Sequence, residues 1–406
     1  AQIIHPDLYE ILAHTEGVVV FHEQVIQIIA TMTGVSLATA DEKRRSLGDR
    51  AGQQEVCDWF FPAATAKGYE LPIIQEIWDV LRAFASFGFC KAHAAAFALP
   101  TYQSAWLKTH YPAAFLAGVL THDPGMYPKR LIVDEARQMG ITIAPIDVNA
   151  SDAVYRVEDH GNAIRIALAT VSGISDGEVQ SIIAGRPYID LNDFVRRSGC
   201  STPVTESLIL TGGFDSLHAD VNRRDLLLHF SDLQKSPSAA VSGAQMNLGF
   251  DPPALISSGL PAMTASESVK YEIDRLGIDM SRHLIEFYGE FLNAIGAVRS
   301  SDLLKQRSQS SVLVAGIKVA MQTPPVRSGK RVIFLTLDDG YGLSDSTFFT
   351  DVQSEYANVL YSTSLLLVRG VTRRTGARGI SIRATGAWDL RAAYESWSAK
   401  QSTLAI

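Results

Sequence analysis

Cysteine is scarce in this sequence, and apolar runs long enough to span a membrane are missing. The 406 residues include three cysteines, Cys57, Cys90 and Cys200. They lie far apart and lack the spacing of a metal site, so we expect reduced thiols rather than disulfides or a zinc site. The missing apolar runs predict a cytoplasmic protein with no membrane partner.

Positive charge is also in deficit. The formal net charge is −7, which is the wrong sign for a protein that coats DNA non-specifically. Any contact with nucleic acid must therefore come from local basic patches. The chain has 47% hydrophobic and 19% charged residues, and its length predicts about two to four globular domains.

The first local signal is a basic loop between two helices. An amphipathic helix stops at Gly88, and a short loop brings Lys91 and His93 to the start of a second helix that runs to Pro112. Free amide groups and the helix dipole add to the ammonium group there, which favours an anion such as phosphate. A solvated helix cap explains the same residues without a ligand.

A basic triplet lies upstream of this loop. Lys43, Arg44 and Arg45 close a helix that opens at Ser36 and stops at Gly48. Two adjacent arginines can both reach one polyanion, and the guanidinium fork suits phosphate oxygens. The triplet therefore strengthens the prediction that this half of the chain contains a phosphate site.

The middle of the chain predicts short helices around a tight turn. Residues 154–170 alternate weakly and predict a strand pair. Gly173, Ser175 and Gly177 follow, in a turn before a helix, where backbone amides can approach a phosphate closely. The arrangement resembles a helix-hairpin-helix motif, which holds the DNA backbone without reading sequence. An ordinary helical connection is the alternative.

Residues 231–265 change character, because Pro, Ser, Ala and Gly dominate and no period emerges. This composition predicts a flexible linker. Within it, Gln245 precedes the spaced apolar residues Met246, Leu248 and Phe250, a pattern that can dock into a groove of a partner protein. The alternative is that these side chains fasten the linker to its own domain.

The last part of the chain predicts a barrel of five short strands, with a helix between the third and the fourth. That order is typical of an OB-fold, a common binder of single-stranded nucleic acid. The expected strands are 312–320, 331–339, 343–349, 364–370 and 379–385, and the expected helix is 351–360.

Basic residues are in excess in this barrel. Residues 312–391 hold ten Lys and Arg against six Asp and Glu, which predicts a face that binds a nucleic-acid backbone. A solvated barrel edge is the alternative. A strand end leading into a turn explains Asp338 and Asp339, so we assign no metal to them. The candidate DNA-binding residues are Lys318, Arg331, Arg373, Arg374 and Arg378.

Two segments resemble the fingers region of bacterial C-family DNA polymerases, which are the alpha subunits of DNA polymerase III and their error-prone relatives. The segments are HPDLYEILAHTEGVVVFHEQVIQIIATMTGVSLATADEKRRSLG and FGFCKAHAAAFALPTYQSAWLKTHYPAAFLAGVL. The resemblance continues through MGITIAPIDVN and, in collinear order, over nearly the whole chain. TPPVRSGKRVIFLTLDDGYG resembles the error-prone branch, and Ser281-Arg282-His283 departs from the Gly-His-Pro of the replicative branch.

The resemblance implies that this chain is the C-terminal part of a DNA-directed DNA polymerase. Arg44 and Arg45, beside Lys43, would contact the incoming triphosphate. Lys91 and His93 would border the nascent base pair. The resemblance also places Gln24, in the FHEQ segment, on the wall of the same pocket.

The same resemblance places the catalytic carboxylates upstream. A polymerase holds two divalent metal ions about 4 Å apart with clustered carboxylates, and the family supplies them from a palm domain that precedes the fingers. We therefore expect no catalytic residue and no metal ligand in this chain, which would be part of a longer protein and inactive alone. Mg²⁺ and deoxynucleoside triphosphates would serve the full-length enzyme.

The expected partners are primer–template and single-stranded DNA, together with a sliding clamp and other translesion or replisome proteins. In the family's hairpin a second glycine usually stands where this chain has Ser175. Two other functions remain open, a non-catalytic scaffold that binds a clamp or partner and a stand-alone single-strand-binding protein.

The predicted fold is therefore multidomain α+β. Its parts are a helical fingers region (1–160), a helix-hairpin-helix region (161–230), the linker (231–265), a helical connector (266–310), an OB-fold barrel (311–390) and a C-terminal tail (391–406).

Overall fold

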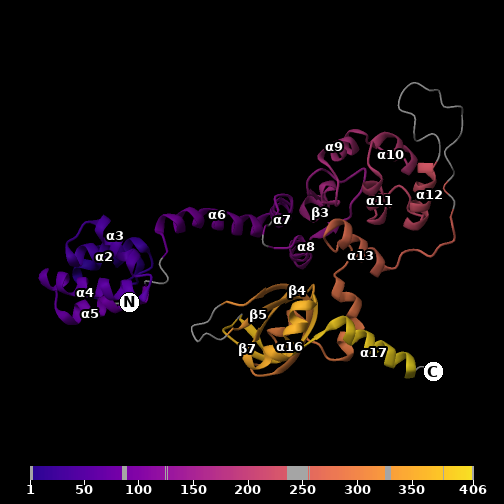
Figure 1. Cartoon of the computed structure of the whole chain (residues 1–406). Coiled ribbons are helices and arrows are strands. Elements are labelled where there is room, and N and C mark those ends of the chain that lie inside the picture. The colour runs from indigo at the N-terminus through magenta and orange to yellow at the C-terminus, as the bar shows by residue number, and fades with distance from the viewer. Residues whose placement is uncertain are drawn as a thin grey trace. The chain divides into compact units, whose positions relative to one another are not determined.

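The chain divides into two compact units, Ala1–Leu107 and Lys108–Ile406, which are drawn in Figure 1. The computed structural model describes residues 3–84, 89–123, 125, 127–235, 255, 257–324, 331–377 and 379–404. Within this part of the chain, no helix is both long enough and apolar enough to span a membrane.

The first unit is helical, as predicted. Its core is formed by one apolar face from each of several helices, with Met32, Phe60 and Trp78 at its centre. The elements are η1 (Pro6–Leu8), α1 (Tyr9–Leu12), η2 (Ala13–Thr15), α2 (His22–Thr33), α3 (Leu37–Ser46), α4 (Arg50–Ala66), α5 (Leu71–Phe84) and the start of α6 (Lys91–His110).

Local sequence signals fix the ends of the helices that carry the basic residues. Ser36 caps α3 by accepting a hydrogen bond from the Thr39 backbone N–H at 3.2 Å, which satisfies one of the free donors of the first turn. The helix ends at Ser46, just before the predicted stop at Gly48. Helix α6 begins at Lys91, as predicted.

The second unit begins with a helical region built on a small sheet. Strand β3 lies between β1, to which it is parallel, and β2, to which it is antiparallel, so the predicted strand pair gains a third strand. The elements are α7 (Pro112–Thr121), α8 (Lys129–Gln138), β1 (Thr142–Ala144), β2 (Arg156–Glu158), η3 (Asp159–Gly161), β3 (Ala163–Arg165), η4 (Leu168–Thr170), α9 (Asp176–Ala184), α10 (Leu191–Ser198), α11 (Thr202–Leu210) and α12 (Arg223–Lys235).

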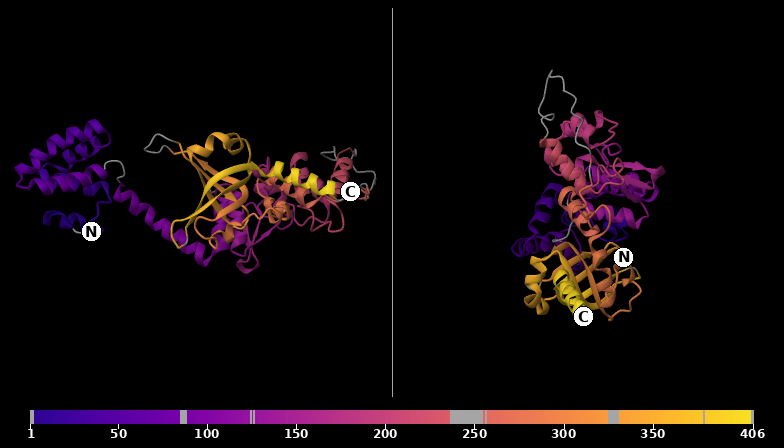
Figure 2. Two further views of the ribbon diagram at one scale, coloured as in Figure 1. Left: turned by 90° about the horizontal axis from the view of Figure 1, so that it is seen from below. Right: turned by 90° about the vertical axis from the view of Figure 1, so that its right-hand side faces the viewer.

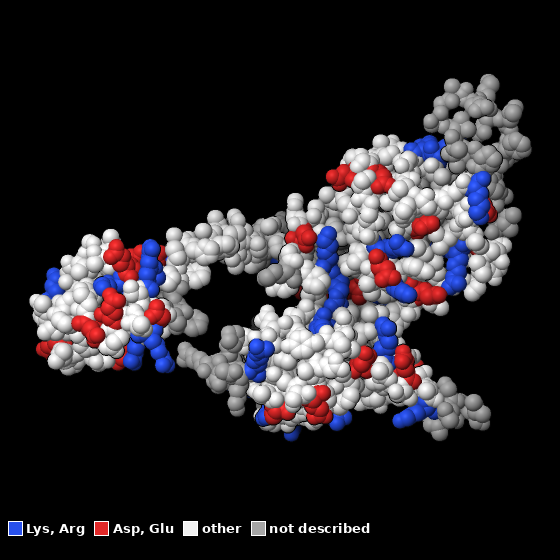
Figure 3. All heavy atoms as spheres, in the orientation of Figure 1, with Lys and Arg blue, Asp and Glu red and all other residues white. Residues whose placement is uncertain are grey.

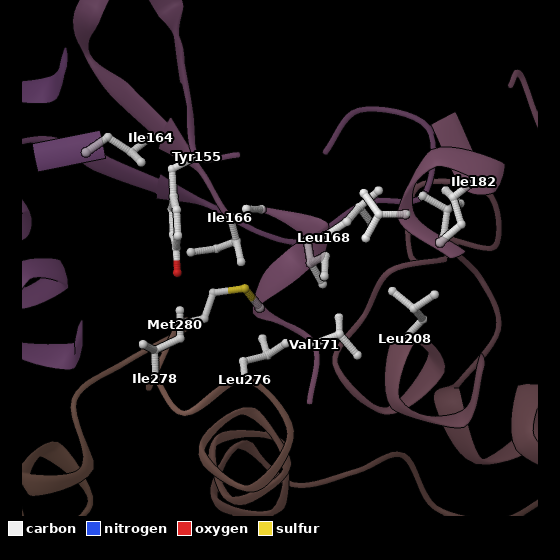
Figure 4. Packing of buried hydrophobic residues seen from close by; sticks show 14 of the residues in the cluster. Tyr155, Ile164, Ile166, Leu168, Val171, Ile182, Leu208, Leu276, Ile278 and Met280 are labelled. Carbon is white, nitrogen blue, oxygen red and sulfur yellow. The ribbon is translucent and has the colours of Figure 1, made fainter. Parts of the chain in front are cut away.

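A connector follows and packs back onto this region. It consists of α13 (Ala265–Leu276), η6 (Leu284–Tyr288), α14 (Gly289–Ala294) and α15 (Ser300–Leu303). Just after α13, Ile278 and Met280 are buried in the core of the helical region. Figure 4 shows their side chains reaching toward Ile166, so the connector is fastened to the region that precedes it.

The chain ends in a closed five-stranded barrel with the predicted topology. The strand order is β4-β5-β6-β8-β7, β6 and β8 are parallel, and a helix joins β6 to β7; this is the OB-fold order. The elements are β4 (Ser311–Gln322), β5 (Ile333–Asp338), β6 (Leu343–Phe348), α16 (Thr350–Ser362), β7 (Leu365–Arg374), β8 (Ile380–Asp389) and α17 (Leu390–Leu404). Figure 2 shows α17 leaving the barrel as the last element.

The predicted domain boundaries differ in part from these elements. The division between the two units falls at 107, inside the predicted fingers range of 1–160. Helix α12 continues to Lys235, beyond the predicted start of the linker. The predicted clamp peptide, with Gln245, Met246, Leu248 and Phe250, lies outside the described residues.

One carboxylate caps two helices of the helical region. Glu178 and Ser175 form a capping box at the start of α9, and Glu178 Oε1 also accepts bonds from the Ser201 backbone N–H at 2.9 Å and hydroxyl at 2.7 Å. Ser201 is the N-cap residue of α11. The hydrogen bonds from Ser201 and Ser175 lower the pKa of Glu178 to about 2.

Replacing this carboxylate tests its role. Glu178→Gln is expected to destabilise the chain by about 1 kcal/mol at pH 7, the usual contribution of a helix cap. The folded-state pKa lies below the unfolded value, so the stabilisation is complete above about pH 4.5 and is lost as the pH falls toward 2. Urea-unfolding midpoints of both proteins should therefore converge over that interval.

Glu206→Gln is the matched control, because Glu206 is an exposed carboxylate on α11. It should leave the midpoint unchanged at every pH. A difference between wild type and Glu178→Gln that stays constant down to pH 2 would contradict the proposed role of the ionised carboxylate.

Candidate functional site

Three of the predicted residues of the first unit, Gln24, Arg44 and Lys91, lie in or beside the first turn of α2. His22 and Glu23 occupy that turn. Arg44, from α3, approaches the His22 ring with Nη1 3.3 Å from Nδ1. The backbone N–H of Lys91, at the start of α6, donates to both Glu23 carboxylate oxygens, at 3.1 and 2.9 Å. Arg44 and the start of α6 thus contact two neighbouring residues of α2.

Both arginines of the triplet are already paired inside the chain. Arg44 Nε lies 2.9 Å from Asp41 Oδ1, and Arg45 donates to Asp41 Oδ2 from Nε at 3.0 Å and from Nη2 at 2.7 Å. Hydrogen bonds from Arg44 and Arg45 lower the pKa of Asp41. The Arg45 pair is exposed enough to be weak, since the Arg45 side chain is 73% exposed, whereas the Arg44 side chain is 22% exposed. A phosphate group could therefore compete with Asp41 for both guanidinium groups.

The third residue of the triplet points elsewhere. Lys43 Nζ lies 3.2 Å from Glu55 Oε1 and 5.3 Å from the centre of the Trp59 ring. These contacts join α3 to α4. They involve other residues than the contacts of Arg44 and Arg45.

An internal carboxylate lies where the sequence predicts an anion at the start of α6. Burial opposes ionisation of Glu23, but hydrogen bonds from the Lys91 backbone and the Cys90 thiol lower its pKa. The Lys91 ammonium group lies 3.4 Å from His14 Nε2 and 5.8 Å from the centre of the Phe21 ring. The start of α6 is therefore an anion site, and the anion that caps its first turn is the Glu23 carboxylate of the chain itself.

His93 and Gln24 have different surroundings. The exposed His93 ring lies between Phe89 and Phe97, with centroids 5.6 and 4.6 Å away. Gln24 is 2% exposed, and its amide bonds the backbone of Val20 and Phe21, the carbonyl of Ile11 and the hydroxyl of Thr15. Gln24 thus positions the loop before α2, and its side chain faces the interior.

The predicted hairpin turn has the expected backbone but an acidic helix start. Gly173 has φ +81°, a conformation that L-residues rarely adopt, and a Cβ there would meet no atom within 4 Å. Ser175 is the N-cap of α9, and Gly177 lies in its first turn with Asp176 and Glu178. Their charges oppose a phosphate at that helix end.

A groove on the barrel surface contains one of the predicted basic residues. It has a volume of about 550 Å³ and is lined by Arg373, Arg383 and Phe349 together with polar residues of β6, β7 and β8. The Arg383 guanidinium lies 5.6 Å from the centre of the Phe349 ring, which is 39% exposed. Its Nη2 is 3.6 Å from Asp351 Oδ2, a pair in which both side chains are 62% exposed.

The other predicted barrel residues do not share this groove. Lys318 Nζ donates to the Leu360 carbonyl at 2.8 Å. Arg374 folds back onto the turn before β4 and donates to the Leu304 carbonyl. Arg331 is exposed, and Arg378 lies outside the described residues. Figure 3 shows both charge signs interspersed on the face of the barrel in view.

Sequence reasoning missed several residues of these sites. Asp41 and Glu23 are ordinary helical carboxylates in the sequence, and only the fold makes them partners of the basic residues. Phe349 is the last residue of the predicted strand 343–349 and could have been recognised as a ring at the end of a strand in a basic barrel. Arg383 was counted in the basic excess without being singled out.

The helical parts of the chain match two protein families. Residues 1–68 match the finger domain of the bacterial DNA polymerase III alpha subunit, and residues 140–226 match a helix-hairpin-helix motif. An error-prone DNA polymerase of Symbiobacterium thermophilum is 32% identical over 93% of this chain and 39% of its own length. The DNA polymerase III alpha subunits of Vibrio cholerae and of Escherichia coli strain K12 are both 30% identical over 97% of this chain and 36% of theirs.

The chain therefore spans less than two fifths of the length of these relatives. The matched finger domain contains α2 and α3, and the matched motif contains the turn at Gly173 and the helices that follow. The chain belongs to the family of bacterial DNA polymerase III alpha subunits and error-prone DNA polymerases, whose finger domain and helix-hairpin-helix motif it carries.

Proposed function

We propose that this chain is the nucleotide-selecting and DNA-holding part of a DNA-directed DNA polymerase that performs template-directed nucleotidyl transfer. The observation that carries the proposal is that Arg44 and the start of α6 both contact the first turn of α2, which lies inside the segment that matches a polymerase finger domain. The collinear similarity to polymerases over 90% or more of the chain supports it.

In this proposal the incoming nucleotide binds at the first turn of α2. Its triphosphate takes the place of Asp41 at the Arg44 and Arg45 guanidinium groups, which offer forked donors for phosphate oxygens. Lys43 contributes positive charge from the neighbouring position and keeps α3 against α4. Asp41 holds the arginines in place until the triphosphate arrives.

Lys91 and His93 border the nascent base pair. The His93 ring already lies within stacking distance of Phe97, and its exposed face is a surface on which a base can pack. Lys91 is fastened to α2 through the Glu23 carboxylate. Gln24 acts as a positioning residue, because it holds the loop that leads to His22 and Glu23.

The barrel groove holds single-stranded template. Arg373 and Arg383 supply charge for the DNA backbone, and Phe349 supplies an exposed ring for a base. Stacking of a base on an aromatic side chain contributes about 1–3 kcal/mol. The turn at Gly173 holds the duplex through backbone amides, since the first turn of α9 is acidic.

The reaction itself requires carboxylates that we place in a palm domain outside this chain. Mg²⁺ bound there would neutralise phosphate charge during transfer of a deoxynucleoside triphosphate. Among the described residues, the group with metal-site geometry is Asp134, Asp279 and His283. Its imidazole donor does not suit a catalytic Mg²⁺ pair, so we assign it no step of the reaction.

The subtype and partners extend the proposal. The resemblance of residues 323–342 favours an error-prone polymerase that works in translesion synthesis, DNA replication and repair in the bacterial cytoplasm. A sliding clamp would bind the peptide that contains Gln245, Met246, Leu248 and Phe250, and other translesion or replisome proteins would join the complex. Acting only as a clamp-binding scaffold is the alternative if DNA binding fails.

The groove can be tested with single-residue variants of this chain. Arg383→Ala and Phe349→Ala are each expected to weaken binding of labelled single-stranded DNA by about 5- to 100-fold, because each removes one charged or stacking contact. Fluorescence anisotropy at fixed salt measures the dissociation constants. Arg383→Ala should also flatten the salt dependence by about one ion, whereas Phe349→Ala should leave it unchanged.

Arg391→Ala is the control, since Arg391 is an exposed arginine on α17 that does not line the groove. Its affinity should equal that of wild type within twofold. Equal affinities for all three variants would rule out the groove as the single-strand site.

The finger cluster is tested in a polymerase that carries this chain together with a palm domain. Replacing Arg44 and Arg45 by Ala is expected to raise the nucleotide KM by about 100-fold, because two charge-assisted contacts of roughly 1.5 kcal/mol each are lost. Steady-state primer extension over a range of nucleotide concentrations gives KM and kcat separately.

Arg50→Ala serves as the control, because Arg50 is exposed at the start of α4. Its KM should match that of wild type. An unchanged KM in the Arg44/Arg45 double variant would sink the assignment of the triphosphate site.

A further inference from the structure

Charged side chains from three segments that are far apart in the sequence meet inside the second unit. Asp134 lies on α8, Asp279 follows α13, His283 is the N-cap of η6, and Asp338 ends β5. Their exposed fractions are 2%, 0%, 1% and 1%. We call these four residues the junction cluster, because they join the helical region, the connector and the barrel.

The packing of its two neighbours places the Asp279 side chain in the cluster. Its neighbours Ile278 and Met280 are buried in the apolar core of the helical region, where Figure 4 shows their side chains. The Asp279 carboxylate belongs instead to the charged group with Asp134 and His283. The apolar packing on both sides thus fixes a carboxylate in a buried position that it would not otherwise occupy.

Several side-chain oxygen and nitrogen atoms of the junction cluster have no hydrogen-bond partner among the described residues. They are Asp134 Oδ2, Asp279 Oδ1 and Oδ2, His283 Nε2 and Asp338 Oδ2. Native proteins rarely leave buried polar atoms in this condition, so a missing ligand is a direct explanation.

The distances between these atoms suit ligands around one ion. Asp134, Asp279 and His283 each offer one possible metal-ligand atom, and these three atoms lie within 4.8 Å of one another. His283 Nε2 is 3.6 Å from Asp134 Oδ2 and 3.6 Å from Asp338 Oδ2, which is too long for a hydrogen bond. Two ligands at about 2.1 Å from a tetrahedral ion lie roughly 3.4 Å apart.

Two arginines lie beside the junction cluster. Arg137 donates one hydrogen bond to Asp134 Oδ1 at 2.6 Å and others to the carbonyl oxygens of Asp279 and Met280. Arg130 is the other nearby guanidinium, with Nη2 3.4 Å from the Lys318 carbonyl. Three carboxylates thus face two guanidinium groups and one imidazole ring.

We propose that Asp134, Asp279 and His283 bind one divalent transition-metal ion of the Zn²⁺ or Mn²⁺ kind, with Asp338 as the fourth ligand. One imidazole nitrogen with carboxylate oxygens suits these ions, whereas Mg²⁺ and Ca²⁺ prefer oxygen ligands alone. The inference does not depend on the proposed polymerase function.

Ion binding has a consequence for the histidine ring. His283 Nδ1 accepts a hydrogen bond from the Ile285 backbone N–H at 3.2 Å, so the proton of the neutral ring lies on Nε2. A metal on Nε2 moves that proton to Nδ1, and the Ile285 contact is lost. A Cβ on Gly340 would lie 2.8 Å from His283 Cγ, so the turn after β5 packs directly against this ring.

The role of the ion is structural. Three segments that are far apart in the sequence supply the ligands, and the helical region, the connector and the barrel each contribute at least one. A closed site with protein ligands at every position contributes folding energy directly. The ion would therefore fix the barrel to α8 of the helical region and to the connector.

The test begins with the whole chain, stripped of metal with a chelator and dialysed separately against Zn²⁺, Mn²⁺ and Mg²⁺. Inductively coupled plasma mass spectrometry is expected to find about one Zn²⁺ or Mn²⁺ per chain and no retained Mg²⁺. The thermal-unfolding midpoint should rise with the retained ion. On binding, the Ile285 backbone amide resonance should shift, as the tautomer change requires.

Two variants and one control locate the ion. Asp279→Asn and His283→Gln should each lose the bound ion and the metal-dependent rise in midpoint. Cys90→Ser should keep both, because it removes an exposed thiol of the first unit that Zn²⁺ could occupy adventitiously. Since each variant is compared with itself with and without metal, destabilisation by the substitution does not obscure the result.

Three outcomes would overturn the proposal. The first is a wild-type chain that retains none of these ions and shows the same midpoint in all three. The second is loss of the ion in Cys90→Ser but not in Asp279→Asn. The third is an Ile285 amide unchanged by metal in a chain whose His283 is protonated on both nitrogens, since an imidazolium ion would then balance the cluster.

Discussion

The second unit depends on the burial of one short segment, residues 278–280. Ile278 and Met280 pack in the apolar core of the helical region, and this packing holds the connector in place. Each fully buried side chain of this kind contributes about 1.5–3 kcal/mol. The same packing places the Asp279 carboxylate in the junction cluster, where burial of an ion is opposed by several kcal/mol unless it is compensated. The packing of the apolar core therefore also determines the position of a carboxylate in the charged cluster.

A second theme is that the basic residues of this acidic chain are held by internal carboxylates. Asp41 holds Arg44 and Arg45, and Glu23 holds the start of α6. The Asp41–Arg45 pair, whose arginine side chain is 73% exposed, contributes about 0–1 kcal/mol to stability, so it is easily exchanged for a polyanion. Net charge alone predicts weak affinity for nucleic acid, whereas these local arrangements leave donors in place for phosphate.

Elements with local signals could be predicted from the sequence. Helix α3 starts at its cap Ser36, α6 starts at Lys91, and the barrel strands alternate between two faces, so both the fold class and the OB-fold order are confirmed. Properties that depend on distant contacts could not be predicted. Gln24 faces the interior because Ile11 and Thr15 accept its amide hydrogens. The junction cluster was missed because its residues come from three segments that are far apart in the sequence.

The central claim is that this chain holds DNA, and the most direct measurement is fluorescence anisotropy of the wild-type chain with labelled primer–template and single-stranded DNA over a salt series. The account predicts micromolar or tighter binding that weakens steeply as salt rises, because released counterions drive the contacts with phosphate. Absence of binding even at low salt would contradict it.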